Sequence, residues 1–149
     1  MGNKKEYKIF EEKNLILEYY GGKFQIDELI AFKIAICEDE NYNPNYNIIH
    51  DFRDAEFLFE LKEISKFIDY TLNVRKNFGN RKSTMLTATP NQVVTSVGYE
   101  LLKKDIPVNV KVVSTVSAAL SFINIPLSNF QLIDSWLCDC QKNTSLVKS

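Results

Sequence analysis

The sequence predicts a single α/β domain built on a mixed β-sheet. Three short apolar runs, at 46–51, 82–87 and 108–113, each end in polar residues and lead into a segment with helical periodicity. This alternation favours parallel strands that are joined by helical crossovers. A hairpin signal near the N-terminus adds at least one antiparallel strand. The expected order is therefore ββαβαβαβα, followed by a final helix.

The N-terminal part is expected to form the hairpin and the first helix. Partial period-two alternation over 7–12 and 15–20 predicts two strands, and the glycines at 21–22 are expected to end the second strand. Apolar residues spaced three and four apart predict a helix over 26–38, with acidic residues in its first turn. We expect its inward face to contain Ile26, Leu29, Ile30, Ile34 and Cys37.

Two longer helices are predicted in the second half of the chain. The longest covers 60–78, and Gly79 follows its last turn. The next helix has a clear start, because Thr89 can cap it, Pro90 suits its first position and Gln92 completes a capping box. The inward residues of these two helices are expected to be Leu61, Ile64, Ile68, Leu72, Val94, Val97 and Leu101.

The domain organisation follows from these elements. We assign residues 1–126 to the α/β domain and 127–141 to a C-terminal helix that packs on the domain or on a dimer partner. Residues 142–149 are expected to form a frayed tail. A length of 149 residues suits one domain with its own hydrophobic core.

The composition excludes several classes of protein. A net charge of −1 without a clustered basic face argues against nucleic-acid binding. No apolar run approaches the roughly 20 residues of a membrane span, and no apolar segment follows the N-terminal lysines. We therefore expect a cytoplasmic protein without membrane insertion. Three cysteines and one histidine are too few for a zinc site, so no metal or cofactor is expected.

Polar residues that follow the three apolar runs make up the candidate site. In a parallel sheet the carboxyl ends of neighbouring strands meet at one edge, where ligands commonly bind. We expect a rim for a ligand or partner formed by Asp51, Arg53, Asp54, Phe57, Thr87, Thr89, Asn91, Ser114 and Thr115. Structural roles compete with this interpretation: Asp51 can pair with Arg53, and Thr89 and either Ser114 or Thr115 can cap helices.

No residue pattern indicates catalysis. His50 and Asp51 would offer a base and its orienting carboxylate, but adjacent residues on a strand point to opposite faces of the sheet. No G-x-S-x-G elbow or similar motif positions a nucleophile. We therefore expect no catalytic residues and a structural role for His50.

Three segments follow one another along the chain: YNIIHDFRDAEF at 46–57, LTATPNQ at 86–92 and VVSTVSAALSFI at 112–123. Together with the opening strand pair, they resemble the SpoIIAA-like (STAS-like) family of bacterial proteins over about residues 7–123. The resemblance implies a SpoIIAA/STAS-type packing of sheet and helices. It also implies non-catalytic regulation through protein contacts, and the broader fold includes lipid carriers.

One departure from the family concerns phosphorylation. Anti-sigma-factor antagonists in this family carry a phosphorylatable serine at the start of the helix after the central strand. The matching segment here, 53–60, has no Ser or Thr, and the first hydroxyl after it belongs to Ser65. The serine phosphoswitch is therefore not expected.

The expected function is a non-enzymatic regulatory or protein-interaction module. Its partner is an unknown protein, and a second copy of the chain in a homodimer is one such partner. The alternative is a small-molecule or lipid carrier that binds its ligand at the polar rim.

Overall fold

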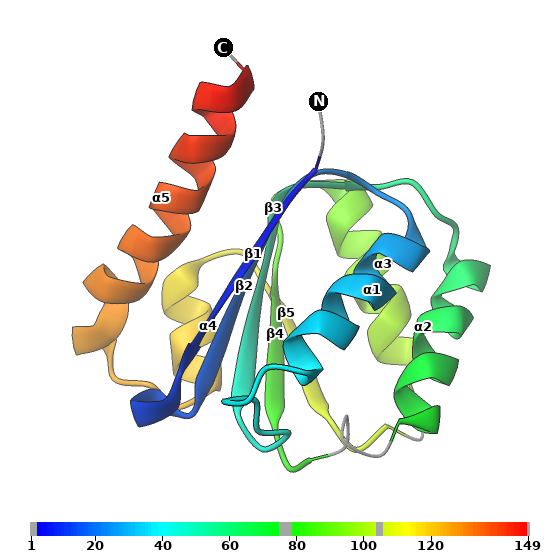
Figure 1. Ribbon diagram of the computed structural model, residues 1–149, viewed down its shortest axis with the longest axis horizontal. Helices are drawn as coiled ribbons and strands as arrows, with labels where there is room; N and C mark the ends of the chain where they lie inside the picture. Colours follow the sequence, from blue (N-terminus) through cyan, green and yellow to red (C-terminus); the bar gives the residue numbers. More distant parts are fainter. Residues whose placement is uncertain (1–2, 75–78, 104–105, 149) are drawn as a thin grey trace.

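The computed structural model describes residues 3–74, 79–103 and 106–148, with only the backbone described over 143–148. Five strands form one sheet in the order β1-β2-β3-β4-β5 (Figure 1). β1 and β2 are antiparallel, and the other three pairings are parallel. The predicted mixed sheet is therefore confirmed. The strands are β1 (Lys4–Phe10), β2 (Leu15–Phe24), β3 (Asn47–Phe57), β4 (Lys82–Leu86) and β5 (Asn109–Val113).

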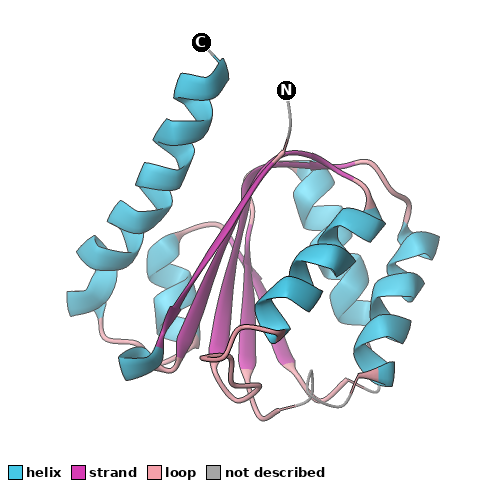
Figure 2. Cartoon of the chain, in the orientation of Figure 1, coloured by secondary structure: helices cyan, strands magenta, loops and turns pink. Residues whose placement is uncertain are grey.

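Helices cover both faces of the sheet. In Figure 2, α1, α2 and α3 lie on one side and α4 and α5 on the other. A separate apolar core fills each of the two layers. The helices are α1 (Ile26–Cys37), α2 (Leu61–Asn73), α3 (Pro90–Leu102), α4 (Val116–Phe122) and α5 (Phe130–Lys148), and the short 3₁₀ segments are η1 (Glu11–Lys13) and η3 (Leu127–Asn129).

The predicted helix starts at Thr89 and Thr115 are present in the structure. Thr89 accepts a hydrogen bond from the Gln92 amide at 3.4 Å, and Thr115 accepts one from the Ala118 amide at 3.1 Å. Each bond satisfies an amide that has no partner within its helix. These caps direct the chain from β4 and β5 back along opposite faces of the sheet.

The prediction that the glycine pair ends the second strand was wrong. β2 continues to Phe24, with Gly22 at a φ of +116°. Between Tyr19 and Gly21 the register with β3 shifts, because β3 contributes one extra residue there. Such a bulge bends a strand without ending it. The β2–β3 pair therefore extends well beyond the last pairing of β3 with β4, which is at Asp51.

Several predicted inward faces were also wrong. The exposed residues among them are Ile34, Leu61, Leu72, Val94 and Leu101. On α3 the buried residues are instead Gln92, Ser96 and Gly98. The Gln92 side chain donates to the carbonyl oxygens of Arg53 and Ala55 at 3.1 and 2.7 Å. These bonds hold α3 with its polar and small residues against the sheet, which turns its larger aliphatic residues outward.

Two helix lengths differ from the prediction. α2 ends at Asn73, whereas its predicted last turn at 75–78 lies outside the described residues. α5 remains helical to Lys148, past the predicted boundary at 141. It packs on its own domain through Ile133, Leu137 and Cys140. None of the helices in the described ranges combines the length and apolarity needed to span a bilayer.

Candidate functional site

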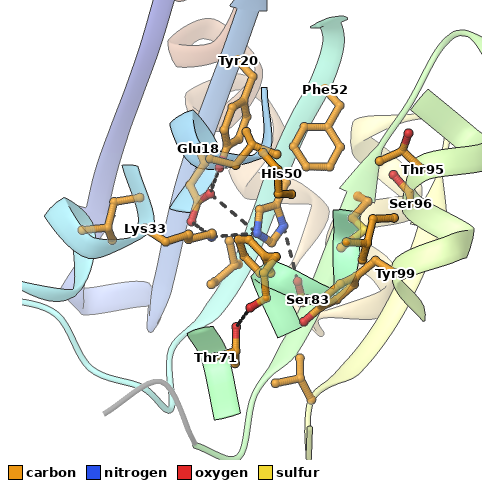
Figure 3. Close-up of a pocket in the computed structure, with 18 of the residues that line it drawn as sticks. Glu18, Tyr20, Lys33, His50, Phe52, Thr71, Ser83, Thr95, Ser96 and Tyr99 are labelled. Carbon is orange, nitrogen blue, oxygen red and sulfur yellow. Dashed lines mark hydrogen bonds and ion pairs between the residues drawn. The ribbon is translucent and has the colours of Figure 1, made fainter. Parts of the chain in front are cut away.

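A cavity of about 120 Å³ lies between the sheet and the layer formed by α1, α2 and α3. Figure 3 shows side chains from both layers pointing toward it. Small-molecule sites are usually concave, mostly apolar and equipped with a few polar groups. The cavity fits this description and is the candidate site. Its apolar wall includes Tyr20, Phe52, Phe57, Phe67, Met85 and Tyr99.

Three ionisable side chains form a buried cluster at the cavity. Glu18 extends from β2, Lys33 from α1 and His50 from β3. The Lys33 Nζ atom lies 2.5 Å from Glu18 Oε2 and 2.9 Å from His50 Nε2 (Figure 3). The Tyr20 hydroxyl donates to Glu18 Oε1 at 2.5 Å. Short contacts of this kind are characteristic of hydrogen bonds to charged groups.

Strand alternation explains why Glu18 faces this cluster. Its neighbours at i−2 and i+2, Ile16 and Tyr20, belong to the core beneath α1–α3, whereas Leu17 belongs to the core on the other face. Because helices cover both faces, a carboxylate on β2 cannot reach solvent, and Glu18 is fully buried. Lys33 lies opposite on α1 and supplies the countercharge. A buried charge without such a partner would be strongly destabilising.

Burial and mutual charge decide the protonation states. Burial alone would raise the pKa of Glu18, but the positive charge of Lys33 and the hydrogen bonds from Lys33 and Tyr20 lower it overall. Burial lowers the pKa of Lys33, and the Glu18 carboxylate opposes this shift. Burial, followed by repulsion from Lys33, lowers the pKa of His50 to about 4. The 2.5 Å contact between Lys33 and Glu18 is that of an ion pair, and His50, with its pKa of about 4, is a neutral imidazole at neutral pH.

Both ring nitrogens of His50 are engaged. Nε2 accepts from Lys33, and Nδ1 donates to the Thr84 carbonyl oxygen at 2.9 Å. The Ser83 hydroxyl oxygen lies 3.3 Å from the same Nδ1. A general base needs a nitrogen within hydrogen-bond reach of the proton that it removes. Since neither nitrogen of His50 is available, the arrangement suits binding and structure rather than proton transfer.

Ser96 adds an unpaired hydroxyl to the cavity wall. It lies on α3, and its Oγ atom is the one buried side-chain polar atom in the described part of the chain without a hydrogen-bond partner. Leaving a buried hydroxyl unpaired costs about 1–3 kcal/mol.

The predicted rim residues Asp51, Arg53 and Asp54 all lie within β3, although the strand was predicted to end at Asp51. Arg53 donates Nε and Nη2 to the two carboxylate oxygens of Asp51, both at 2.9 Å, and this bonding raises the pKa of Arg53. The Tyr19 hydroxyl donates to Asp54 at 2.6 Å. None of the three lines the cavity. The structural ion pair weighed for Asp51 and Arg53 is present.

Most of the remaining predicted rim residues form side-chain hydrogen bonds to backbone groups. Thr87 is buried and donates to the Val113 carbonyl oxygen at 3.2 Å. Asn91 pairs with both backbone groups of Phe57, at 2.8 and 3.1 Å. Thr89 and Thr115 are the caps described above, and Ser114 is exposed. Of the nine predicted residues, Phe57 alone lines the cavity.

Sequence reasoning missed most polar residues of the cavity, among them Glu18, Lys33, Arg81, Ser83 and Ser96. One signal for Lys33 was present, since it lies on the same side of the first helix as Leu29, Ile30 and Ile36. Separately, the described ranges contain no group of three His, Cys, Asp or Glu side chains that could hold a metal ion.

Comparisons with known proteins support the fold. No model of a protein family matches the chain, and no curated protein matches it. Among solved structures, the chain is similar to an uncharacterized protein of the DUF3478 family, with a SpoIIAA-like fold, from Shewanella loihica PV-4. The TM-score is 0.53 at 11% identity, and the match covers 82% of this chain and 94% of the other. This similarity confirms that the chain has a SpoIIAA-like α/β fold.

Proposed function

We propose that the protein is a non-enzymatic binding module that holds one small, largely apolar molecule in the cavity between the sheet and α1–α3. The observation that carries this proposal is the cavity itself, whose aromatic wall encloses a compact set of buried polar side chains. A structural core would be filled at such a position, because protein interiors are packed to nearly crystalline density.

The polar groups support binding rather than chemistry. Lys33 hydrogen-bonds both Glu18 and His50, which leaves its ammonium group one N–H donor that can orient a ligand without exchanging a proton with it. A carrier or a ligand-responsive regulator would both use such a site, and both are compatible with a SpoIIAA-like fold.

The proposal is tested by comparing ligand binding to the wild type with binding to a variant in which a larger side chain fills the cavity. Native mass spectrometry and thermal-shift measurements would use toluene, benzyl alcohol, benzamide and benzoate as probes. Ser96→Leu places a larger side chain in the cavity, and Ser65→Leu is a matched control at an exposed position on α2. We expect binding in the wild type and in Ser65→Leu but not in Ser96→Leu. Absence of binding by every probe to the wild type would refute the proposal.

A second candidate is a regulatory module that acts through protein contacts, and one observation favours it. Four aliphatic residues of α3 are exposed: Val93, Val94, Leu101 and Leu102, the largest exposed fraction being 67% at Leu101. Contiguous exposed apolar surface commonly marks an interaction site. Co-purification with wild type and with the variant Val94→Asp/Leu101→Asp tests this candidate. A partner that both proteins capture equally would not bind through α3.

A further inference from the structure

The side chain of Arg81 is buried at the cavity and hydrogen-bonds neutral groups. Arg81 is 8% exposed and lines the cavity. Its Nε donates to the Pro44 carbonyl oxygen at 2.7 Å, and its Nη2 donates to the Asn43 carbonyl oxygen at 2.9 Å and to the Tyr42 hydroxyl at 3.1 Å. A guanidinium group has five N–H donors. Within the described ranges, Nη1 makes no hydrogen bond.

The charges of the described residues around the cavity do not balance. Lys33 is paired with Glu18, and His50 is neutral, so these three side chains together carry no net charge. Arg81 adds a full positive charge, and among the described residues no carboxylate lies within 4 Å of it. Buried arginines normally pair with an anion, because the cost of removing their charge from water is otherwise uncompensated.

The volume of the cavity limits the size of the occupant. An apolar cavity of about 150 Å³ in another protein holds one benzene molecule. The present cavity, at about 120 Å³, is slightly smaller. Tyr20, Phe52 and Tyr99 are among its wall residues and favour an aromatic ring through edge-to-face contacts.

We propose that the ligand is a monocarboxylate with a hydrophobic part about the size of one aromatic ring, and that Arg81 binds its carboxylate. The proposal rests on the proposed binding function and specifies the chemical class of its ligand. The ring occupies the apolar wall of the cavity, and the carboxylate supplies the missing countercharge for Arg81. The two N–H groups of Arg81 Nη1 remain for the carboxylate, and a hydrogen bond to a charged carboxylate is roughly twice as strong as one to a neutral amide.

The test compares three probes that share one ring: benzoate, benzamide and benzylammonium. Their dissociation constants are measured by isothermal titration calorimetry. We expect benzoate to bind at least about tenfold more tightly than benzamide, the effect of one charge-assisted hydrogen bond, and benzylammonium not to bind. Arg81→Gln should weaken benzoate binding to the level of benzamide and leave benzamide binding unchanged. Lys111→Gln removes an exposed positive charge from β5 and should change neither value.

The outcomes separate this proposal from the binding function. If benzamide binds the wild type as tightly as benzoate, the carboxylate assignment is refuted, while the binding function stands. If Arg81→Gln retains the preference for benzoate, Arg81 is not the carboxylate-binding group. If neither these three probes nor toluene and benzyl alcohol bind the wild type, both proposals are refuted. Should Arg81→Gln not fold, the comparison of the three probes on wild type and on Arg81→Lys, which keeps the charge, decides the question.

Discussion

The Lys33 ammonium group donates a hydrogen bond to His50 Nε2 across 2.9 Å, and this contact holds the imidazole in its neutral form. A protonated ring would carry a hydrogen on Nε2 that points at another cation. The opposite nitrogen, Nδ1, donates to the Thr84 carbonyl oxygen. The neutral tautomer with its hydrogen on Nδ1 therefore makes a hydrogen bond at each ring nitrogen. Protonation of His50 therefore requires the cluster at the cavity to rearrange.

The stability of the protein should fall between pH 6.5 and pH 4. The pKa of His50 is about 4 in the folded protein and about 6.5 in an unfolded chain, so the unfolded state binds the proton first as the pH falls. The full contribution is present above pH 6.5 and is lost by pH 4, at about 1.4 kcal/mol per pH unit or about 3 kcal/mol in all. Urea unfolding at a series of pH values measures this change.

Two controls make the pH prediction specific to His50. The variant His50→Gln should be less stable at pH 7 but should show a shallower dependence of stability on pH in the same interval. The chain has a single histidine, so its imidazole resonances can be followed by NMR without ambiguity. A measured pKa near 6.5 in the folded protein would contradict the prediction.

Removing the ammonium group of Lys33 should destabilise the protein strongly. Lys33→Met leaves the fully buried Glu18 carboxylate without its countercharge, a change that costs about 3–5 kcal/mol at buried pairs. Adding Glu18→Gln should recover a large part of the loss, because the buried charge is then gone. Chemical denaturation of the wild type, both single variants and the double variant measures the coupling.

The matched control for this cycle is an exposed lysine. Lys62 pairs with Glu60 at 3.5 Å, and the side chains are 80% and 76% exposed. Lys62→Met should change the free energy of unfolding by less than about 1 kcal/mol. Equal effects of Lys33→Met and Lys62→Met would show that the buried pair makes no special contribution.

The order of elements could be predicted because each depends on local sequence. Caps at Thr89 and Thr115 and the periodicity of the apolar runs need no knowledge of distant residues. The cavity cluster could not be found in the same way. Glu18 and Lys33 are 15 positions apart. The local pattern identifies Glu18 only as one residue of a strand with partial alternation. Only the packing of helices on both faces shows that this acid is buried.

The predicted rim also shows that local sequence pattern does not reveal contacts between distant residues. Asp51 was expected to be the last residue of its strand and Arg53 to follow it, because polar residues commonly mark the end of a buried strand. The strand continues, since Arg53 neutralises Asp51 and the bulge in β3 allows pairing with β2 to Phe57. Whether a polar residue ends a strand or is paired within it depends on partners that local pattern does not reveal.

Gln92 should contribute more to stability than any aliphatic residue on the outer face of α3. Its side chain accepts from the amides of Ala88 and Thr89 and donates to two carbonyl oxygens of β3. Gln92→Leu removes all four bonds and leaves buried backbone groups unpaired, so we expect a loss of about 2–4 kcal/mol. Denaturant unfolding followed by circular dichroism measures it.

The comparison variant for this prediction is Val94→Gln. Val94 is 57% exposed, so replacing it with a polar residue should change stability by less than about 0.5 kcal/mol. The amphipathic pattern of the sequence alone predicts the reverse order, with Val94 in the core. A larger loss from Val94→Gln than from Gln92→Leu would therefore contradict the orientation of α3.

Ser96→Ala should stabilise the ligand-free protein, whereas the loss of a buried, hydrogen-bonded hydroxyl usually destabilises a protein. The Oγ atom of Ser96 is buried without a partner, so its removal relieves about 1 kcal/mol or more of desolvation cost. Ser83 is the matched control, because it is also buried but its hydroxyl oxygen lies 3.3 Å from His50 Nδ1. Ser83→Ala should lower the melting temperature, whereas Ser96→Ala should raise it. A lower melting temperature in both variants would mean that the Ser96 hydroxyl is satisfied in the ligand-free protein.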